Sequence, residues 1–332
     1  MKILVTGGLG YIGSHTCCEL LQNNYELVVL DDLSNSSRDV ISKIEEITHK
    51  SFSFYYGSML NKELLDEIFS KEKIDAVIDF AAYKAVGESV QKPVEYYTNN
   101  VSSVLVLLDV MKKYQVKKIV FSSSATVYGD PKRVPIVESD PVGGTTNPYG
   151  TSKLMVEKIL TDLYHADPTF SIVILRYFNP IGAHESGLIG ENPKGIPANL
   201  IPYIVKVANG ELDHLNIFGN DYDTKDGTGV RDYIHVVDLA VGHIKALEKT
   251  KKSGLYIYNL GTGIGYSVLD IVNSFMKVNH VDVPYEFVDR RPGDIAECYA
   301  DNTKAREELG WVPTKTIEDM CRDSYLFVTK NQ

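Results

Sequence analysis

The first half of the chain alternates short, continuously apolar runs with longer stretches whose apolar residues recur at helical spacing. The helical stretches are Ser14–Gln22, Lys62–Ser70, Val94–Lys113 and Tyr149–Tyr164. The apolar runs predict strands at Lys2–Thr6, Glu26–Asp31, Phe52–Tyr56, Ala76–Phe80, Lys118–Ser122 and Ser171–Arg176. Runs such as Leu27–Leu30 contain no polar position, which is typical of parallel strands covered by helices on both faces. The pattern therefore predicts an α/β fold with a Rossmann-type doubly wound parallel sheet.

This alternation ends near Phe178, and the residues that follow are rich in Gly, Pro and Asn. Loops that wrap a ligand cleft are predicted at Asn179–Gly182 and Asn192–Pro197, with helices at Asn199–Ala208, Val237–Lys249 and Val268–Val278. We expect a nucleotide-binding domain over residues 1–178 and a smaller C-terminal α/β substrate domain over residues 179–332. Some late elements are expected to return to the first sheet.

Composition narrows the class of protein. The 332 residues are 44% apolar and 23% charged, which is ordinary for a soluble globular protein. A net charge of -10 argues against a nucleic-acid partner, which requires a basic surface. No apolar stretch approaches the roughly 20 residues that span a bilayer, and the first residues do not resemble a targeting segment.

The four cysteines are Cys17, Cys18, Cys298 and Cys321, and their spacing matches neither a zinc site nor a disulfide framework. We therefore expect a reduced, cytoplasmic protein without a membrane partner and without a metal ion.

A glycine-rich turn follows the first predicted strand. Gly7, Gly10 and Gly13 permit, in that order, a tight bend, close approach of a pyrophosphate and close packing of the next helix. The N–H groups at the start of that helix would then bind the phosphates. Asp31 ends the second strand, where a carboxylate accepts hydrogen bonds from a ribose and repels a 2′-phosphate. Unless Asp31 is simply a turn residue, the combination predicts NAD rather than NADP.

Tyr149 and Lys153 stand four residues apart in a segment that begins at Pro148, a residue favoured in the first turn of a helix. A helix would place both side chains on one face, where the ammonium would lower the tyrosine pKa. Tyr149 would then act as a general base near neutral pH. Ser124 lies at the end of a predicted strand, where such sheets bind ligands, and would hydrogen-bond the reacting oxygen. Spacing alone leaves open that the Tyr–Lys pair is incidental.

Together with further motifs, these residues resemble the extended short-chain dehydrogenase/reductase family over nearly the whole chain. The motifs are Thr6–His15, Phe80–Ser89, Ser122–Gly129, Arg176–Pro180, Gly227–His235 and Arg291–Asp294. Within the family, the chain is most similar to epimerases of UDP-hexoses. The resemblance implies that UDP-glucose and UDP-galactose are interconverted through a 4-keto intermediate, with NAD bound throughout, by a homodimer.

The resemblance also assigns roles to individual positions. The catalytic residues would be Tyr149, Lys153 and Ser124. These three would also contact NAD, together with Gly7, Gly10, Tyr11, Ile12, Gly13, Asp31, Asn35, Ser58, Met59, Phe80, Ala81, Lys84, Asn99 and Phe178. The substrate would meet Lys84, Ser124, Tyr149, Asn179, Asn199, Leu200, Asn216, Phe218, Arg231, Arg291, Asp294 and Cys298.

Two of these assignments have a physical argument of their own. Arg231 and Arg291 suit a diphosphate because it needs planar donors, although Arg231 is alternatively paired with its neighbour Asp232. The family commonly has an acidic residue after the third strand, where this chain has Ser58, whose hydroxyl still accepts a hydrogen bond.

Substrate breadth depends on one position near the end of the Pro-Gly-Asp segment. In the family, a bulky aromatic residue there restricts the enzyme to plain hexoses, whereas a small residue leaves room for an N-acetyl group. That position is Cys298, which predicts that UDP-N-acetylhexosamines are accepted as well. A shift of one residue would place Tyr299 there and reverse the prediction.

Two other functions are compatible with the same fold. A nucleotide-sugar 4,6-dehydratase needs an extra acid just after the strand-end hydroxyl, but this chain has Ala125 and Thr126 there. A non-catalytic NAD-sensing regulator has no use for Tyr149 and Lys153. Both alternatives are therefore weaker than an epimerase.

Overall fold

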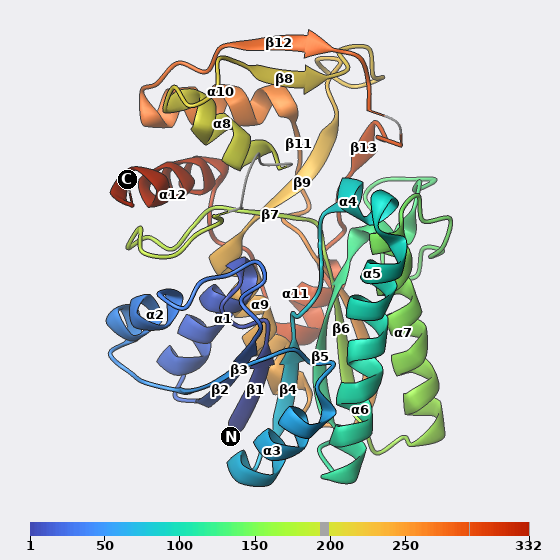
Figure 1. Ribbon diagram of the computed structural model, residues 1–332. Coiled ribbons are helices and arrows are strands. Elements are labelled where there is room, and N and C mark those ends of the chain that lie inside the picture. The colour runs from blue at the N-terminus through green and yellow to red at the C-terminus, as the bar shows by residue number, and fades with distance from the viewer. Residues whose placement is uncertain (193–198, 292, 332) are drawn as a thin grey trace.

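Seven parallel strands form the central sheet of the protein, seen in the lower part of Figure 1. The computed structural model describes residues 1–192, 199–291 and 293–331. Most of the loop predicted at Asn192–Pro197, and Pro292 of the Arg291–Asp294 motif, lie outside the described residues. The strand order is β10 (Gly254–Leu260), β6 (Ser171–Tyr177), β5 (Lys118–Ser124), β4 (Ala76–Asp79), β1 (Lys2–Thr6), β2 (Glu26–Asp31) and β3 (Ser53–Tyr56).

This order confirms the predicted doubly wound fold, since the chain reverses direction across the sheet between β1 and β4. Every neighbouring pair in the sheet is parallel. Six of the strands lie where the apolar runs predicted them, with ends that differ by at most two residues. The seventh strand, β10, comes from beyond residue 178 and pairs with β6 along its whole length.

Helices cover both faces of the sheet, as continuous apolar strands require. One face packs against α1 (Tyr11–Gln22), α2 (Val40–Thr48), α9 (Val236–Lys249) and α11 (Thr303–Leu309). The opposite face packs against α3 (Lys62–Glu72), α6 (Ser103–Lys113) and α7 (Pro148–Ala166). Alternate strand residues enter the two cores. Val5 and Val29 lie in the first, and Leu4 and Val28 lie in the second.

One predicted helix is interrupted. The stretch expected as a single helix over Val94–Lys113 forms α5 (Pro93–Tyr97), a π-helical turn at Thr98–Ser102, and then α6. The wide turn lets the buried Asn100 side chain accept from Tyr83 N at 2.8 Å and donate to Ser152 Oγ at 3.1 Å. Apolar periodicity does not reveal such a turn, because the cause is a polar contact distant in sequence.

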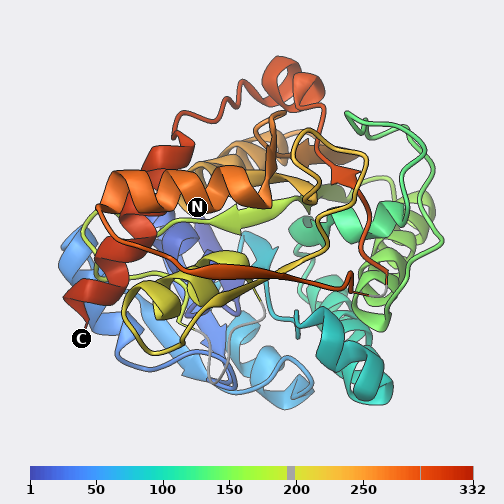
Figure 2. The same cartoon turned by 90° about the horizontal axis from the view of Figure 1, so that it is seen from above.

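The later residues build a second unit above the carboxyl ends of the central strands. It contains a four-stranded sheet of β7 (Asn179–Ile181), β9 (Val230–His235), β11 (Gly265–Ser267) and β13 (Glu297–Cys298), and a pair of strands, β8 (Leu215–Phe218) and β12 (Tyr285–Val288). Its core lies among α8 (Leu200–Ala208), α10 (Val268–Asn279) and α12 (Ile317–Lys330). Figure 2 shows these yellow-to-red elements lying across the sheet.

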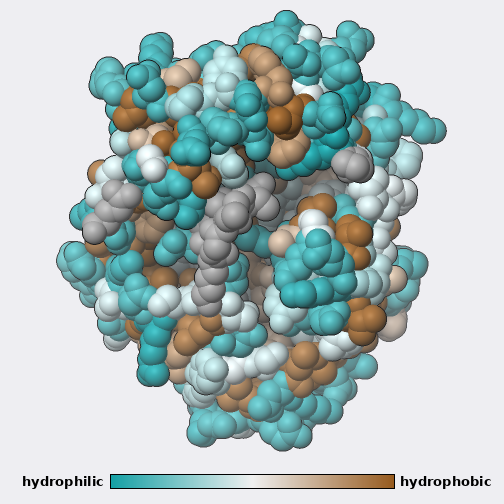
Figure 3. Space-filling view, turned by 45° about the horizontal axis from the view of Figure 1, so that its top comes forward, coloured by the Kyte–Doolittle hydropathy of each residue, from teal (hydrophilic) through white to brown (hydrophobic). Residues whose placement is uncertain are grey.

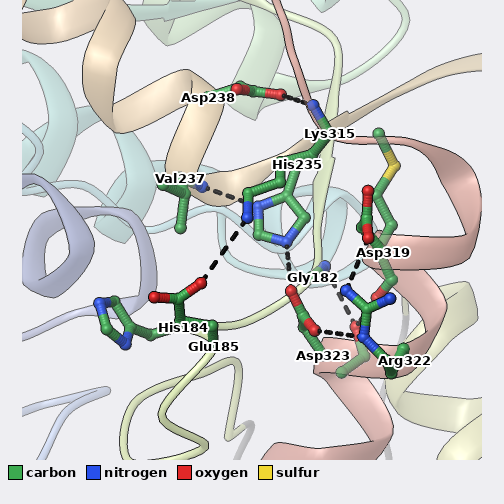
Figure 4. Close-up of polar contacts among 12 residues, drawn as sticks. Gly182, His184, Glu185, His235, Val237, Asp238, Lys315, Asp319, Arg322 and Asp323 are labelled. Carbon is green, nitrogen blue, oxygen red and sulfur yellow. Dashed lines mark hydrogen bonds and ion pairs between the residues drawn. The ribbon is translucent and has the colours of Figure 1, made fainter.

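A buried polar junction ties α12 to the strands below it (Figure 4). His235 Nε2 lies 3.2 Å from Asp323 Oδ2, and both side chains are almost fully buried. Gly182 donates its N–H to Ser324 Oγ at 3.1 Å. Gly182 has a φ of +94°, and a Cβ atom there would lie 2.8 Å from the His235 ring, so a larger residue does not fit. Among the described residues, no helix is long and apolar enough to cross a membrane.

Candidate active site

A deep cleft of about 540 Å³ opens at the carboxyl ends of the central strands. Its hollow is visible between the upper and lower parts of the surface in Figure 3. Most residues predicted to contact NAD line it, namely Gly7, Gly10, Tyr11, Ile12, Gly13, Asp31, Asn35, Ser58, Met59, Phe80, Ala81, Lys84, Asn99, Tyr149 and Lys153. Phe178 and Ser124 are not among the lining residues. Residues from six separate segments therefore meet in one cavity.

The glycine turn has the shape that a dinucleotide requires. Gly7 has a φ of +65°, and a Cβ atom there would lie 2.9 Å from the Ala81 backbone nitrogen. A Cβ atom at Gly13 would overlap the Gly7 carbonyl oxygen. Side chains at these two positions would therefore push the turn away from the sheet, while the glycines leave the start of α1 open to a phosphate. The residues present fit a bound dinucleotide.

Asp31, predicted to contact the ribose, also makes contacts within the chain. Its two carboxylate oxygens accept from the Leu9 and Leu33 backbone N–H groups, each at 2.9 Å, and from Ser36 Oγ at 2.7 Å. The side chain thus fastens the glycine turn to the end of β2. These three donors fix the orientation of the Asp31 carboxylate at the edge of the cleft.

Tyr149 lies in the first turn of α7, which Asn147 caps by accepting from Gly150 N at 2.8 Å. Burial raises the pKa of Tyr149, and a hydrogen bond with Ser124 opposes that shift. Ser124 Oγ accepts from Thr126 N at 3.2 Å and from Thr126 Oγ1 at 3.0 Å. Because those two bonds occupy its lone pairs, the Ser124 hydroxyl proton is left to be donated toward Tyr149.

Lys153 does not lower the Tyr149 pKa in the way that the spacing predicts. Its ammonium donates to the Ser122 carbonyl oxygen at 2.7 Å, and the pKa of Tyr149 is raised rather than lowered. Burial lowers the pKa of Lys153 itself to about 8, although the charges of Asp79 and Glu157 act in the opposite direction. The prediction that Lys153 lowers the Tyr149 pKa is therefore wrong, because desolvation of Tyr149 outweighs the helical pairing.

A carboxylate that sequence reasoning missed joins the two sides of the cleft. Glu191 Oε1 accepts from Lys84 Nζ and from Asn199 Nδ2, both at 2.8 Å. The Lys84 ammonium also lies 5.6 Å from the centre of the Tyr11 ring. Lys84, expected to contact both cofactor and substrate, is thus held beside Asn199, which precedes α8.

The remaining predicted substrate residues gather on the upper unit. Arg291 donates to Asp294 at 2.9 Å, and its guanidinium lies 4.8 Å from the Phe218 ring centre. Within the described ranges, Arg231 forms no salt bridge with Asp232, so that alternative is wrong. Asp232 instead accepts from Thr262, Gly263 and Ala300.

Asn179, Asn216, Leu200 and Cys298 occupy four neighbouring elements of the upper unit. Asn179 donates to the Asp232 carbonyl at 3.1 Å, and Cys298 pairs in register with Arg231. Leu200 begins α8 and packs on the upper core. Asn216 Oδ1 is buried and has no hydrogen-bond partner within the described part of the chain.

Two residues of the inner cleft, Ser122 and Tyr177, were not predicted as site residues. Both lie at the carboxyl ends of neighbouring parallel strands, β5 and β6. The rule that ligands bind at that edge would have selected them, had it been applied to every strand and not only to β5.

Comparison with known proteins agrees with this geometry. A family model described as GDP-mannose 4,6 dehydratase matches residues 4–324. The chain therefore belongs to the extended short-chain dehydrogenase/reductase family, in its UDP-glucose 4-epimerase group. A UDP-glucose 4-epimerase of Pasteurella multocida (strain Pm70) is 61% identical over 332 residues, covering 100% of this chain and 98% of the relative.

Solved structures lead to the same group. The structure of UDP-glucose 4-epimerase from Bifidobacterium longum, in complex with NAD+ and UDP, superposes with a TM-score of 0.97 at 57% identity, covering 100% of this chain and 99% of that one. The UDP-Glc/GlcNAc 4-epimerase of Campylobacter jejuni superposes with a TM-score of 0.87 at 38% identity, covering 99% of each chain.

Proposed function

We propose that this protein interconverts UDP-glucose and UDP-galactose with a tightly bound NAD that is regenerated in every turnover. The observation that carries the proposal is the meeting of Tyr149, Lys153 and Ser122 with the glycine turn in a single cleft. NAD, when bound, supplies a hydride acceptor for C4 of the sugar. Gly7, Gly10, Gly13 and Asp31 would hold its adenosine and phosphate portions.

Tyr149 is the base that takes the proton of the sugar 4-hydroxyl. Because burial raises its pKa, Tyr149 needs positive charge and hydrogen bonds that stabilise the phenolate. Ser124 donates toward the phenolate oxygen, and Lys153, one turn further along α7, lines the same cleft. With oxidised NAD bound, the Tyr149 phenolate would gain a nearby positive charge, so ionisation of Tyr149 would be coupled to the presence of the oxidised cofactor.

The UDP portion anchors the substrate while the sugar ring turns. Arg231 and Arg291 supply planar donors for the diphosphate, and Phe218 supplies an aromatic surface beside Arg291. Binding energy spent on the nucleotide holds the 4-keto intermediate in the cleft without fixing its sugar ring. The ring can then present its other face and recover the hydride with inverted configuration.

Asn216 indicates that the nucleobase of the bound nucleotide sugar is uracil. Its buried, unpartnered Oδ1 atom requires a donor, and the N3–H group of uracil is one, whereas N3 of cytosine is an acceptor. Asn216 and Phe218 alternate with the core residues Leu215 and Ile217 along β8, so both side chains leave the core on the same side.

A dehydratase, which the description of the family model suggests, is not supported. Elimination of water needs an acid beside the strand-end hydroxyl. Ala125 and Thr126 follow Ser124, and Thr126 donates both its N–H and its hydroxyl to Ser124. The acidic residues that line the described cleft, Asp31, Asp32, Asp39 and Glu191, come from other segments.

The test uses the protein as purified, with no NAD added. UDP-galactose and UDP-N-acetylgalactosamine are incubated separately, and the nucleotide sugars are resolved by chromatography. Conversion of both to their 4-epimers supports the bound-NAD mechanism and the broad specificity. Conversion of UDP-galactose alone keeps the epimerase and rejects the broad specificity. No conversion, even with NAD supplied, contradicts the assignment.

The proposed acceptance of UDP-N-acetylhexosamines rests on the different surroundings of Cys298, in β13, and of Tyr299, which follows it. Cys298 packs on the cluster that contains Phe178, whereas the neighbouring Tyr299 ring lies beside Gly265. Tyr299 follows the end of β13 and, within the described residues, is not part of the cluster around Phe178. Burial raises the pKa of the Cys298 thiol to about 11, so this residue is a small neutral wall rather than a nucleophile.

Replacing Cys298 with tyrosine should therefore narrow the specificity. We expect C298Y to retain activity on UDP-galactose within a few-fold and to lose at least about tenfold on UDP-N-acetylgalactosamine, because the ring fills the space of the N-acetyl group. The ratio of the two kcat/KM values is the measurement. Cys321→Ser, a change at another buried cysteine, is the control, and an unchanged ratio in C298Y would reject the role of this position.

We also propose that the enzyme is a cytoplasmic homodimer. All four cysteines are free thiols, which suits a reducing compartment. Five apolar side chains are exposed on the adjoining helices α4 (Val86–Gln91), α5, α6 and α7, namely Val86, Val90, Val94, Leu105 and Met155. These helices lie together along one edge of the molecule in Figure 1 and offer a face for a second copy.

A further inference from the structure

We propose that His243 is a positioning residue, which fixes the Tyr177 hydroxyl as a hydrogen-bond acceptor for the carboxamide NH₂ group of the nicotinamide. The inference rests on the proposed function, because it concerns the same bound NAD. Tyr177 ends β6 and lines the inner cleft together with Ser122, Tyr149 and Lys153. His243 lies behind it in α9 and is fully buried.

The hydrogen bonds of His243 determine where its proton lies. Nδ1 is 2.9 Å from the Leu239 carbonyl oxygen, which can only accept, so Nδ1 carries the hydrogen. Burial lowers the pKa of His243 to about 4, and the ring is therefore neutral at physiological pH. A neutral imidazole with its hydrogen on Nδ1 has only a lone pair on Nε2.

This lone pair decides the role of Tyr177. Tyr177 Oη lies 2.6 Å from His243 Nε2, and the tyrosine must be the donor because Nε2 can only accept. A tyrosine hydroxyl has one proton, so the side of Oη that faces the cleft presents lone pairs alone. Burial raises the pKa of Tyr177, and a hydrogen bond with Ser122 opposes that shift, as expected when the serine donates. A ligand at this point must bring a donor.

The imidazole is also fixed in space. Its ring centre lies 4.7 Å from that of Phe80 and 5.3 Å from that of Tyr177, with tilted and edge-on planes respectively. Phe80 itself lines the cleft. The fixed Tyr177 hydroxyl oxygen is an acceptor, so it can bind only the NH₂ side of a carboxamide and not its carbonyl side. It therefore selects one orientation of the nicotinamide ring, which decides the ring face presented to the sugar.

A purely structural His–Tyr pair makes a different prediction. Breaking such a pair would weaken the fold and the binding of every dinucleotide alike. Loss of the proposed acceptor would instead remove the preference for a cofactor that carries an NH₂ group. The probe is 3-acetylpyridine adenine dinucleotide, in which a methyl group replaces the carboxamide NH₂.

The experiment displaces NAD from the purified holoenzyme with increasing concentrations of added NAD, isotopically labelled, or of the acetylpyridine analogue. Released NAD is quantified by mass spectrometry. We expect the wild type to prefer NAD by about fivefold, the equivalent of about 1 kcal/mol for one hydrogen bond. Tyr177→Phe and His243→Phe should bring this ratio close to one. His165→Phe, at an exposed position near the end of α7, is the control and should keep the wild-type ratio.

Each outcome decides a separate point. A fivefold preference that persists in both variants overturns the inference, while the epimerase assignment stands on the activity of the wild type. Tyr177→Phe keeps the test decisive if His243→Phe does not fold. Wild-type protein that holds neither dinucleotide contradicts the proposed function as well.

Discussion

At the scale of single residues, burial disfavours the charged forms of the two central side chains of the site, Tyr149 and Lys153. Burial shifts the pKa values of Tyr149 and Lys153 in opposite directions, and each shift favours the neutral form. With a pKa of about 8, Lys153 remains an ammonium near neutral pH, whereas Tyr149 is held in its neutral form. The sequence predicted which residues meet, but not their charges, because desolvation depends on neighbours distant in the chain.

Removal of the Tyr149 hydroxyl should stop the reaction without emptying the cleft. We expect Tyr149→Phe to lower kcat by about 10³-fold, in the range typical of a lost general base, with NAD and UDP binding nearly unchanged. Epimerisation assays and cofactor content measure the two effects. Tyr164→Phe, further along the same helix, is the control. Full activity of Tyr149→Phe would refute the assignment of the base.

Lys153 should leave a signature in the pH dependence of stability. Its pKa is about 8 in the folded protein and roughly 10.4 in an unfolded chain, so the unfolded state binds more protons between these values. Stability should therefore rise with pH across this window and stay flat below it. Lys153→Met lacks the effect. The measurement is the difference in Tm between wild type and variant, both without NAD. We expect the wild-type Tm to rise relative to that of the variant from pH 8 to pH 10, and a constant difference would contradict the lowered pKa of Lys153.

At the scale of elements, the strands were predictable and the interruptions were not. Continuous apolar runs identify strands buried on both faces, and this property is local in sequence. The π-helical turn at Thr98–Ser102 depends instead on Asn100 contacting Tyr83 and Ser152. The contact between Glu191 and Lys84, 107 residues apart, is equally invisible to local pattern.

The glycine turn and α1 form one element whose geometry tolerates no side chain at Gly13. We expect Gly13→Ala to lose most of the bound NAD, because the new Cβ atom would overlap the Gly7 carbonyl and shift the turn. The cofactor content of the purified protein, read from absorbance after denaturation, is the measurement. Gly87→Ala, where a Cβ atom meets nothing within 4 Å, is the matched control. Equal NAD content in both variants would reject this account of the turn.

At the scale of the whole molecule, two units made from interleaved parts of the chain enclose one cleft. The central sheet takes β10 from the second half, while the upper unit begins directly after β6. The sequence motifs indicated residues on both sides of the cleft. They did not indicate that β10 joins the central sheet, because this depends on the pairing of Gly254–Leu260 with β6. Strand pairing over such a distance is set by the assembled core rather than by a local signal.

The proposed dimer should depend on the exposed apolar face of α4–α7. Val94 is 71% exposed in the single chain, and Val94→Glu would place a charge in an apolar interface. We expect light scattering to show a dimer for the wild type and a shift toward monomer for the variant. Val312→Glu, at another exposed valine, should remain dimeric. A monomeric wild type would refute the proposal.

The central claim is that one bound NAD removes a hydride from C4 and returns it to the same carbon. The measurement that tests it most directly uses UDP-galactose deuterated at C4, incubated with the protein as purified, with the product examined by mass spectrometry and NMR. We expect UDP-glucose that retains deuterium at C4, with none lost to water and none transferred to unlabelled substrate. Loss of deuterium to solvent would show that the C4 hydrogen leaves as a proton, and would contradict the hydride mechanism.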